Sequence, residues 1–234
     1  MSLNFRPNHT CSTLSLRLHQ FLVIFGFRRS ISSILRSTIL PDPEKPPQTL
    51  STAQENISQP RTAPCYIVLC DGVKTVVLEK DLKEAKVRTS KEFIVHTNHD
   101  TPPPEDSFAQ GGGESGRVKH EVSSIKGMDE WVEESMERRA CVQRKWDSLK
   151  ARQEKKFRER EEREGREGEV VSVREETLKG WMKADPVMNE STHFACILDP
   201  KMGVIRFLER GLEDDSDEEE DRDGDERFNV SDQE

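Results

Sequence analysis

The sequence predicts an α+β protein, in which strands pair as local hairpins and helices occupy a separate part of the chain, rather than a βαβ protein. Two hairpin patterns and one long helical pattern indicate this class. In each hairpin, two short runs rich in β-branched and aromatic residues flank a turn. The runs are CYIVLC (65–70) with KTVVLE (74–79), and THFACIL (192–198) with VIRFLE (204–209).

Turn residues separate the strands of both hairpins. Asp71-Gly72 is typical of a two-residue hairpin turn, because these residue types tolerate the positive φ angles that such turns require. Asp199 to Gly203 carries a proline and a glycine and is also predicted to turn. A third strand is predicted from Glu92 to Thr97, after a charged connection from Lys80 to Lys91.

Two helices are predicted between the hairpins. The first begins at about Ser123 and has an apolar stripe as far as Leu149, formed by Ile125, Met128, Trp131, Val132, Met136, Ala140 and Trp146. Residues 147–169 continue it with opposite charges about four residues apart, a spacing that stabilises a solvated helix. A short second helix at 173–183 ends before Asp185-Pro186.

The composition predicts an ordered region between poorly ordered ends. Apolar residues make up 32% and charged residues 35% of the 234 residues, so much of the chain has too little apolar surface to offset the entropy of ordering. We expect a poorly ordered N-terminal segment and linker at 1–63, an ordered region at 64–210 and a disordered acidic tail at 211–234. A mobile loop rich in proline and glycine is expected at 101–120, inside the ordered region.

The formal net charge of -9 is unevenly distributed. Residues 1–41 contain arginines and serines but no acidic residue, whereas Glu213 to Glu226 is almost continuously acidic. The N-terminal composition suits a mitochondrial presequence, and its apolar patch, Phe21 to Phe27, is too short to span a membrane. Five cysteines without a CxxC pair predict reduced thiols and argue against a zinc knuckle. A cytoplasmic location is therefore favoured, with a mitochondrial location as the alternative.

Partners follow from the same charges. Acids balance bases in the charged helix, so nucleic-acid binding is not expected. The acidic tail favours a basic protein as a partner. No cofactor and no transmembrane segment is expected.

The stretch EFIVHTNHD (92–100) places five polar side chains directly after an apolar run. In one hypothesis, Thr97 and Asn98 simply end the strand with local hydrogen bonds. In a second, His96, His99 and Asp100 bind a metal ion. In a third, the segment belongs to a catalytic site.

The catalytic hypothesis rests on a resemblance. Thr97-Asn98-His99-Asp100 after an apolar strand resembles a motif of acid ceramidases and N-acylethanolamine-hydrolysing acid amidases, especially the fungal ceramidase-like sequences. These are N-terminal-nucleophile cysteine hydrolases of linear amides. Further segments resemble the family in the same order, and these are Cys70-Asp71-Gly72 with KTVVLEKDL, Ser135-Met-Glu-Arg-Arg139 with Cys141, and Pro186 to Asp199 with Gly203. Together they cover about 100 residues of the C-terminal part of the family's domain.

This resemblance implies a fold and a set of site residues. The fold would be part of an αββα sandwich of antiparallel sheets and helices. Asn98 would donate a hydrogen bond to the oxyanion of the tetrahedral intermediate, with Thr97, His99 and Asp100 holding it in place. The catalytic arginine would be Arg138, with Arg139 as the alternative because Met136-Glu137 departs from the family's acidic pair. Asn189 would orient neighbouring groups.

The nucleophile departs from the family pattern. A complete relative carries its cysteine, then an arginine and an aspartate, well over a hundred residues before this motif. Thr10-Cys11-Ser12 superficially resembles a cleavage junction, but no acidic residue occurs before Asp42. Cys11 is therefore not expected to be the nucleophile, nor are Cys65 and Cys70, which fit a strand.

Two functions follow as hypotheses. The first is a ceramidase-like amidohydrolase of N-acyl lipid amides, represented by its C-terminal portion and inactive alone because it lacks the nucleophile half. Either the chain is truncated, or a missing N-terminal subunit supplies that half. The second is an inactive charged scaffold derived from such a hydrolase.

Overall fold

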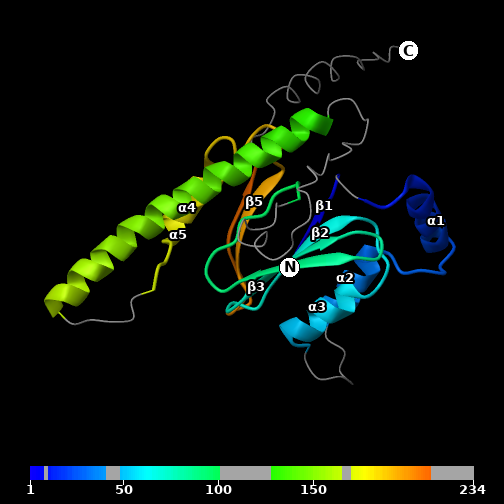
Figure 1. Ribbon diagram of the computed structural model, residues 1–234, viewed down its shortest axis with the longest axis horizontal. Helices are drawn as coiled ribbons and strands as arrows, with labels where there is room; N and C mark the ends of the chain where they lie inside the picture. Colours follow the sequence, from blue (N-terminus) through cyan, green and yellow to red (C-terminus); the bar gives the residue numbers. More distant parts are fainter. Residues whose placement is uncertain (8–9, 41–47, 101–127, 165–169, 212–234) are drawn as a thin grey trace, which may run out of the picture.

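The computed structural model describes residues 1–7, 10–40, 48–100, 128–164 and 170–211. Over these residues it has five helices, a four-stranded antiparallel sheet and a separate β-hairpin (Figure 1). The α+β class predicted from the sequence is therefore confirmed. The elements are β1 (Ser2–Phe5), α1 (Thr13–Ile24), α2 (Ile31–Ile39), α3 (Leu50–Ser58), β2 (Cys65–Cys70), β3 (Thr75–Lys80), β4 (Ala85–Ser90), α4 (Met128–Glu164), α5 (Glu175–Lys183), β5 (Phe194–Asp199) and β6 (Val204–Arg210).

The first predicted hairpin is confirmed and forms the centre of the larger sheet. The sheet order is β1-β2-β3-β4, and β2 pairs with β3 from Cys65 opposite Lys80 to Cys70 opposite Thr75. Gly72 lies in the turn with a φ of 87°, a conformation that residues with a Cβ rarely adopt. Both strands are paired on each side, so their backbone groups are satisfied within the sheet.

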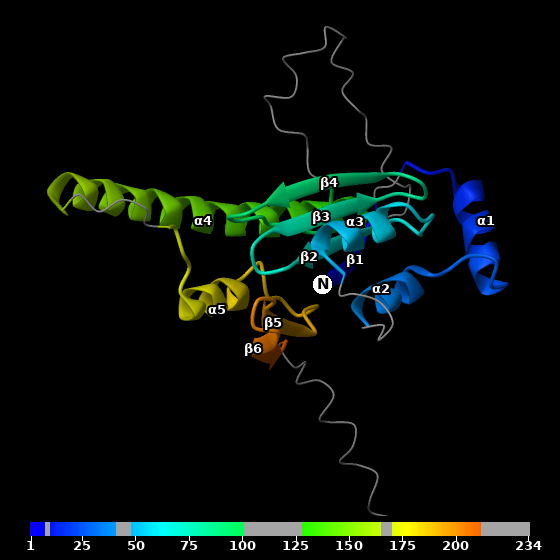
Figure 2. The same ribbon diagram turned by 90° about the horizontal axis from the view of Figure 1, so that it is seen from below.

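Helices α2 and α3 cover one face of this sheet (Figure 2). Alternate side chains of β2 and β3 point toward the two helices and form the main core with them. The buried members are Ile34, Leu35, Ile57, Cys65, Ile67, Leu69, Val76 and Leu78. Ser30 and Thr49 begin the helices as N-caps, each accepting a hydrogen bond from the backbone N–H three residues later.

Lys80 connects the end of β3 to the end of α3. Its side chain is buried, and Nζ donates to the carbonyl oxygens of Ser58 and Pro60 at 2.7 and 3.0 Å. A cation suits this position because carbonyl oxygens at the C-terminus of a helix carry partial negative charge. Burial lowers the pKa of Lys80.

The third strand lies at β4, so the prediction of a strand at Glu92–Thr97 is wrong. β4 is an outer strand of the sheet, and its sequence, AKVRTS, carries two basic residues and has no buried residue. Charged side chains are common on edge strands, where they oppose pairing with other chains. The apolar run Phe93-Ile94-Val95 is only half-buried and has no strand partner among the described residues.

The segment after β4 runs antiparallel to α4 along its side. Lys150 Nζ contacts Glu92 Oε2 at 2.9 Å, and the Phe93 ring stacks on Trp146 with centroids 4.5 Å apart. The end of the segment reaches Ser135, about four turns earlier on the helix. The spacing is consistent, because about six extended residues and about fifteen helical residues each span roughly 20 Å. The apolar run therefore packs on a helix instead of in a sheet.

The prediction of a poorly ordered N-terminal segment and linker at 1–63 is corrected for its described residues, which form one strand and three helices. β1 pairs antiparallel with β2, with Ser2 opposite Val68 and Phe5 opposite Cys65. α3 lies inside the predicted linker, and its Ile57 is fully buried against the sheet. The few apolar residues of α2 and α3 are enough to hold these helices in place, because β2 and β3 supply the other side of the hydrophobic core.

The second hairpin and the short helix before it are confirmed. β5 and β6 pair antiparallel around the turn at Asp199–Gly203, and Gly203 has a φ of 67°. α5 lies against this hairpin, and the ammonium groups of Lys179 and Lys183 each lie 5.5 Å from the centre of the Phe207 ring.

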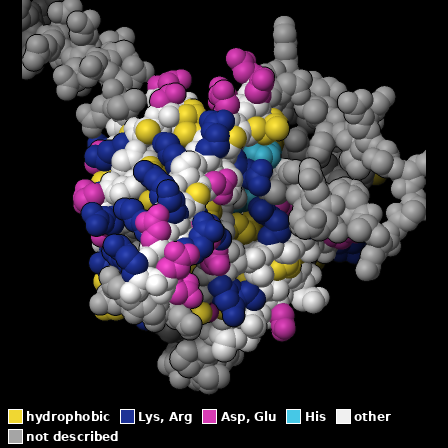
Figure 3. Space-filling view, turned by 60° about the vertical axis from the view of Figure 1, so that its left-hand side comes forward, with side chains coloured by type: hydrophobic (Ala, Val, Ile, Leu, Met, Phe, Trp, Pro, Cys, Tyr) yellow, Lys and Arg dark blue, Asp and Glu magenta, His cyan; other side chains and the backbone are white. Residues whose placement is uncertain are grey.

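The long charged helix is confirmed as far as Glu164. On the face that Figure 3 shows, Lys and Arg side chains are interleaved with Asp and Glu. The expected mobile loop at 101–120, residues 165–169 of the expected helix and residues 212–234 of the acidic tail lie outside the described residues. Among the helices that the structure describes, none has both the length and the apolar character needed to cross a membrane.

Candidate functional site

Ser135 of α4 lies at the centre of the candidate site and is fully buried. Its Oγ accepts a hydrogen bond from the backbone N–H of Asn98 at 2.8 Å and lies 3.1 Å from His99 Nδ1. Its carbonyl oxygen accepts from Thr97 Oγ1 at 2.9 Å. One residue of α4 therefore fixes three successive residues that follow β4, and we call these four residues the Asn98 cluster.

The side chain of Asn98 points away from Ser135 toward β1. Its Nδ2 donates to Asn4 Oδ1 at 2.7 Å, in an exposed position. A backbone held from one side and an amide N–H presented on the other is the arrangement that a preorganised hydrogen-bond donor needs. An incoming oxygen atom can replace the Asn4 side chain, which is itself exposed.

Asp100 anchors the end of the segment to the sheet. Its carboxylate accepts from Arg6 Nε at 2.7 Å and Nη2 at 2.6 Å, and from the Tyr66 hydroxyl at 2.7 Å. Burial alone raises the pKa of Asp100, but the hydrogen bonds from Arg6 and Tyr66 outweigh it, so the pKa lies below its usual value. Burial and Asp100 raise the pKa of Tyr66, which stays a neutral donor. Asp100 is thus an ionised structural anchor.

Two neutral histidines lie between this anchor and α4. His96 packs edge-on against the Tyr66 ring, with centroids 4.3 Å apart, and its Nδ1 lies 2.9 Å from Arg88 Nη2. Burial and the charge of Arg88 lower the pKa of His96 to about 4. Burial and the charge of Arg139 lower the pKa of His99. Both imidazoles are therefore neutral near pH 7.

The two candidate arginines face different surroundings. Arg138 pairs with Glu134 on α4, with Nη1 and Oε2 3.6 Å apart. Arg139 lies nearer the histidines, and burial followed by the charge of Arg88 lowers its pKa. Among the described residues, its Nε is buried without a hydrogen-bond partner. An unused donor beside the Asn98 cluster makes Arg139, the alternative from the sequence, the better placed cation.

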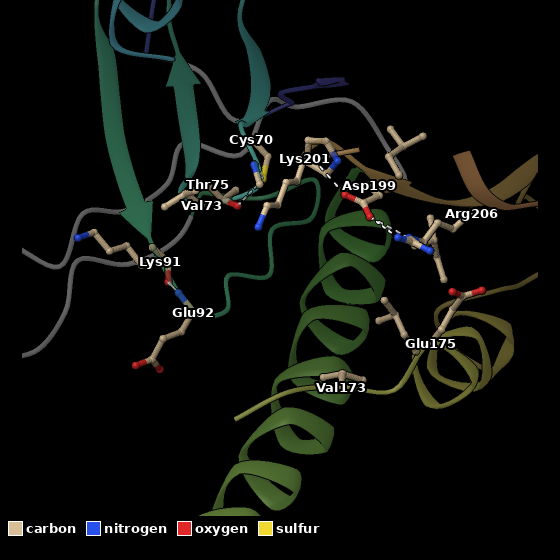
Figure 4. Close-up of a pocket in the computed structure, with 16 residues that line it drawn as sticks. Cys70, Val73, Thr75, Lys91, Glu92, Val173, Glu175, Asp199, Lys201 and Arg206 are labelled. Carbon is tan, nitrogen blue, oxygen red and sulfur yellow. Dashed lines mark hydrogen bonds and ion pairs between the residues drawn. The ribbon is translucent and has the colours of Figure 1, made fainter. Parts of the chain in front are cut away.

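A pocket of about 500 Å³ lies between the turns of the two hairpins (Figure 4). Cys70 and Thr75 line it from the β2–β3 hairpin, and Asp199 and Arg206 line it from the β5–β6 hairpin. Asp199 Oδ2 accepts from Arg206 Nη2 at 2.6 Å, so this ion pair forms one wall. The pocket brings together two segments of the family resemblance that are about 130 residues apart.

Asn189 does not join the Asn98 cluster through its observed hydrogen bonds. Its Oδ1 accepts from Thr192 Oγ1 at 3.1 Å and from the Ser191 N–H at 3.2 Å. These bonds close the turn that leads into β5. The structure thus gives Asn189 a local role in turn formation.

The cysteines include no disulfide. Cys11 lines a hollow of about 220 Å³ with Asp81, and burial together with the hydrogen bond to Asp81 raises its pKa to about 11. Burial raises the pKa of Cys65 to about 11 as well. Both thiols remain protonated near neutral pH, and a protonated thiol is a poor nucleophile.

The metal hypothesis for His96, His99 and Asp100 is not supported. The carboxylate of Asp100 is engaged by Arg6 and Tyr66. In the part of the chain that the structure describes, no group of three or more His, Cys, Asp and Glu residues is placed to hold a metal ion.

The sequence did not assign roles to several residues of the site. They are Asn4 of β1, Arg6 directly after β1, Tyr66 of β2 and Ser135 of α4. The signal for Ser135 was present, since it stands three residues before Arg138. No local signal marks Arg6, because its partner Asp100 is 94 positions away.

Comparison of the chain with protein-family models, with curated proteins and with solved structures finds no match in any of the three.

Proposed function

We propose that the chain carries the oxyanion-donor part of a ceramidase-type hydrolase that cleaves the amide C–N bond of a ceramide-like N-acyl lipid. One observation carries this proposal above the others. Thr97-Asn98-His99 and the segment Ser135 to Arg139 are the two site segments of the family resemblance, and they meet through the three hydrogen-bonding contacts of Ser135. The two segments are 37 residues apart along the chain, so their contact is a tertiary one that neither motif requires by itself.

Asn98 supplies the chemistry in this proposal. When a thiolate attacks the amide carbon, the C=O electron pair moves onto oxygen, and the Asn98 Nδ2–H donates to that oxyanion. The donor is neutral and its backbone is fixed by Ser135, so little reorganisation accompanies the developing charge. The intermediate then collapses and breaks the C–N bond, and the amine leaves with the proton that the thiol gave up. Water hydrolyses the resulting thioester, which releases the fatty acid and regenerates the thiol.

The nucleophile is proposed to lie on a polypeptide segment outside these 234 residues, because all five of their cysteines are among the described residues. Raised pKa values make Cys11 and Cys65 poor nucleophiles, as described above. The outer face of the β5–β6 hairpin supports a missing partner, because Phe194, Leu198, Ile205 and Leu208 are each at least half exposed there. We propose that this face packs against the remaining strands of an αββα sandwich.

A charged scaffold is the second candidate. It is favoured by α4, which continues beyond the sheet for several turns (Figure 1). Its far half carries exposed pairs such as Lys155 with Glu159, 3.9 Å apart, which support a solvated helix. For this function we propose that the acidic residues 213–226 bind a basic protein.

Fatty-acid release separates the two candidates. The protein, purified after expression from its full coding sequence, is incubated with N-acylsphingosine and with N-acylethanolamine in detergent micelles, and free fatty acid is quantified. Enzyme function predicts release that Asn98→Ala removes and that Asn56→Ala retains. Asn56 is a matched control because it is an exposed asparagine of α3, on the opposite face of the sheet. Absence of release together with capture of a basic protein by the acidic region would favour the scaffold.

A further inference from the structure

Helix α1 exposes an apolar stripe to solvent. Leu14, Leu18, Phe21 and Phe25 follow one another at spacings of four, three and four residues, so they lie on one side of the helix and its C-cap. Their exposed fractions are 80%, 54%, 53% and 60%. We call these residues the α1 stripe. Large apolar side chains exposed in a continuous row mark a surface that binds something.

The opposite side of α1 packs against the rest of the protein. His19 is buried, and burial with the charges of Arg28 and Arg61 lowers its pKa. Leu16, Leu22 and Val23 are half-buried on that side. The helix therefore has apolar residues on two sides, and only the inner side is covered by the protein.

The exposed charged residues of α1 and α2 are arginines, whereas Asp81 and Glu84 line a hollow with Ser12 and Ser15 at the start of α1. Arg17, Arg29 and Arg36 are exposed on or near α1 and α2, and residues 1–41 contain no acidic residue. Arg29 donates to the Ser33 carbonyl oxygen and to the Ser37 hydroxyl, both of which are uncharged. The whole chain carries a formal net charge of -9, so residues 1–41 are positively charged in a chain that is negative overall.

A second apolar feature lies on the neighbouring helix. Leu35, Ile39 and Leu40 line a hollow of about 600 Å³ at the end of α2, together with Ser32 and Arg36. A guanidinium and a hydroxyl beside an apolar hollow can bind a phosphate-containing headgroup and an acyl chain together. α1 and α2 lie at one end of the molecule, away from the free end of α4 (Figures 1 and 2).

We propose that α1 and α2 dock the protein on an anionic lipid surface, with the α1 stripe inserted among the acyl chains and the arginines on the headgroups. Exposed leucine and phenylalanine beside arginine is the pattern of helices that lie in the membrane interface. The exposed charges that α1 and α2 themselves carry are arginines, which favour an anionic membrane over a second copy of this chain, because two copies docked by this end would bring like charges together. This docking is separate from amide hydrolysis and stands whether or not the protein is an enzyme.

Vesicle sedimentation of the full chain tests the docking. The probes are vesicles of phosphatidylcholine alone and of phosphatidylcholine mixed with phosphatidylserine. Docking predicts binding to the mixed vesicles that weakens as salt rises and is much weaker on the neutral ones. Each of Arg17→Gln and Arg36→Gln is expected to weaken binding about fivefold. The double variant Leu18→Asp, Phe21→Asp is expected to weaken it at least about tenfold.

A matched control and a second measurement keep the outcomes distinct. Val170→Asp alters a residue that is 79% exposed outside α1 and α2, and it should bind as the parent does. Circular dichroism checks that each variant keeps its helix content. Equal binding to neutral and anionic vesicles, or no binding to either, would overturn the proposal. So would a dimer, detected by sedimentation velocity, that the α1 stripe variant dissociates while vesicle binding stays absent.

Discussion

Ser135 Oγ accepts a hydrogen bond from the backbone N–H of Asn98 at 2.8 Å, and this bond joins the N-terminal part of α4 to the segment that follows the sheet. Ser135 is fully buried, whereas the Asn98 amide group reaches the surface beside Asn4. A rigid inner contact thus positions an accessible donor. The stability and the proposed chemistry of the site both depend on this relationship.

Ser135→Ala is predicted to destabilise the protein by about 1–3 kcal/mol, because the buried N–H of Asn98 loses its acceptor. Urea unfolding gives the free energy, and hydrogen exchange should show faster exchange of the Asn98 amide than in the parent. Ser148→Ala is the control, since Ser148 is an exposed serine of the same helix. Equal effects of the two substitutions would contradict the anchoring role of Ser135.

Asp100→Asn is predicted to cost about 3 kcal/mol, at the low end of the range for breaking a buried pair, because the buried Arg6 guanidinium loses its nearer carboxylate but keeps Asp81 at 3.9 Å. Glu209→Gln is the control. Its pair with Lys183 has the same 2.6 Å distance, but both side chains are more than 40% exposed, so little stability should be lost. The two pairs have equal distances and differ in burial, so the difference between the urea midpoints of the two variants measures the effect of burial on the ion pair. Similar losses would show that Arg6 and Asp100 are not paired in the interior.

The lowered pKa of His96 predicts that the folded protein loses stability in mild acid. Its pKa is about 4 in the folded protein, below the usual value of about 6.5, because of burial first and Arg88 second. Between these values the unfolded chain binds more protons, so the contribution of neutral His96 is complete above about pH 6.5 and falls as pH drops toward 4. Arg139 and His99 oppose its protonation in the same way, and Asp100 favours it.

The free energy of unfolding measured from pH 7 to pH 4 tests this dependence. His96→Gln should flatten the profile in this interval. His193→Gln is the control, because His193 is exposed. A profile that His96→Gln leaves as steep as before would show that His96 is solvated. Below this interval Asp81 contributes as well, since the hydrogen bonds from Thr10 outweigh burial and lower its pKa to about 2.

Gly72→Ala is predicted to be more destabilising than Gly203→Ala. Both glycines have positive φ, which costs an alanine roughly 1–2 kcal/mol. A Cβ on Gly72 would also lie 2.6 Å from Lys201 Cβ and 2.9 Å from Lys201 N, whereas a Cβ on Gly203 meets nothing within 4 Å. The difference in unfolding free energy between the variants measures the contact of the two hairpin turns. Equal losses would show that these turns do not touch.

The local elements of the fold could be predicted from the sequence, and the pairings across it could not. Both hairpins and both central helices carry their own signals, such as Asp71-Gly72 and the apolar spacing around Trp131. β1 carries none, because Ser2 to Phe5 becomes a strand only through its pairing with β2. β4 was missed because an exposed edge strand has no apolar run, and the run at Phe93 packs on Trp146 of α4 instead.

The candidate site divides in the same way. Asn98 and the Ser135 to Arg139 segment could be named from sequence, because each is a short motif. Arg6, Tyr66 and Asn4 could not, because they reach the site through the pairing of β1 with β2. The choice between Arg138 and Arg139 also needed the structure, since helical residues one position apart face directions about 100° apart.

The turnover of N-acylsphingosine by Asn98→Ala, assayed in a preparation that contains the segment supplying the nucleophile, is the most direct test of the proposed chemistry. The proposal predicts that kcat falls by about 10²–10³ while KM changes little, because the donor acts on the oxyanion and not on the bound amide. The parent and Asn56→Ala should turn over the lipid at equal rates. Fatty-acid release by Asn98→Ala at the parent's kcat would contradict the role of Asn98 as oxyanion donor.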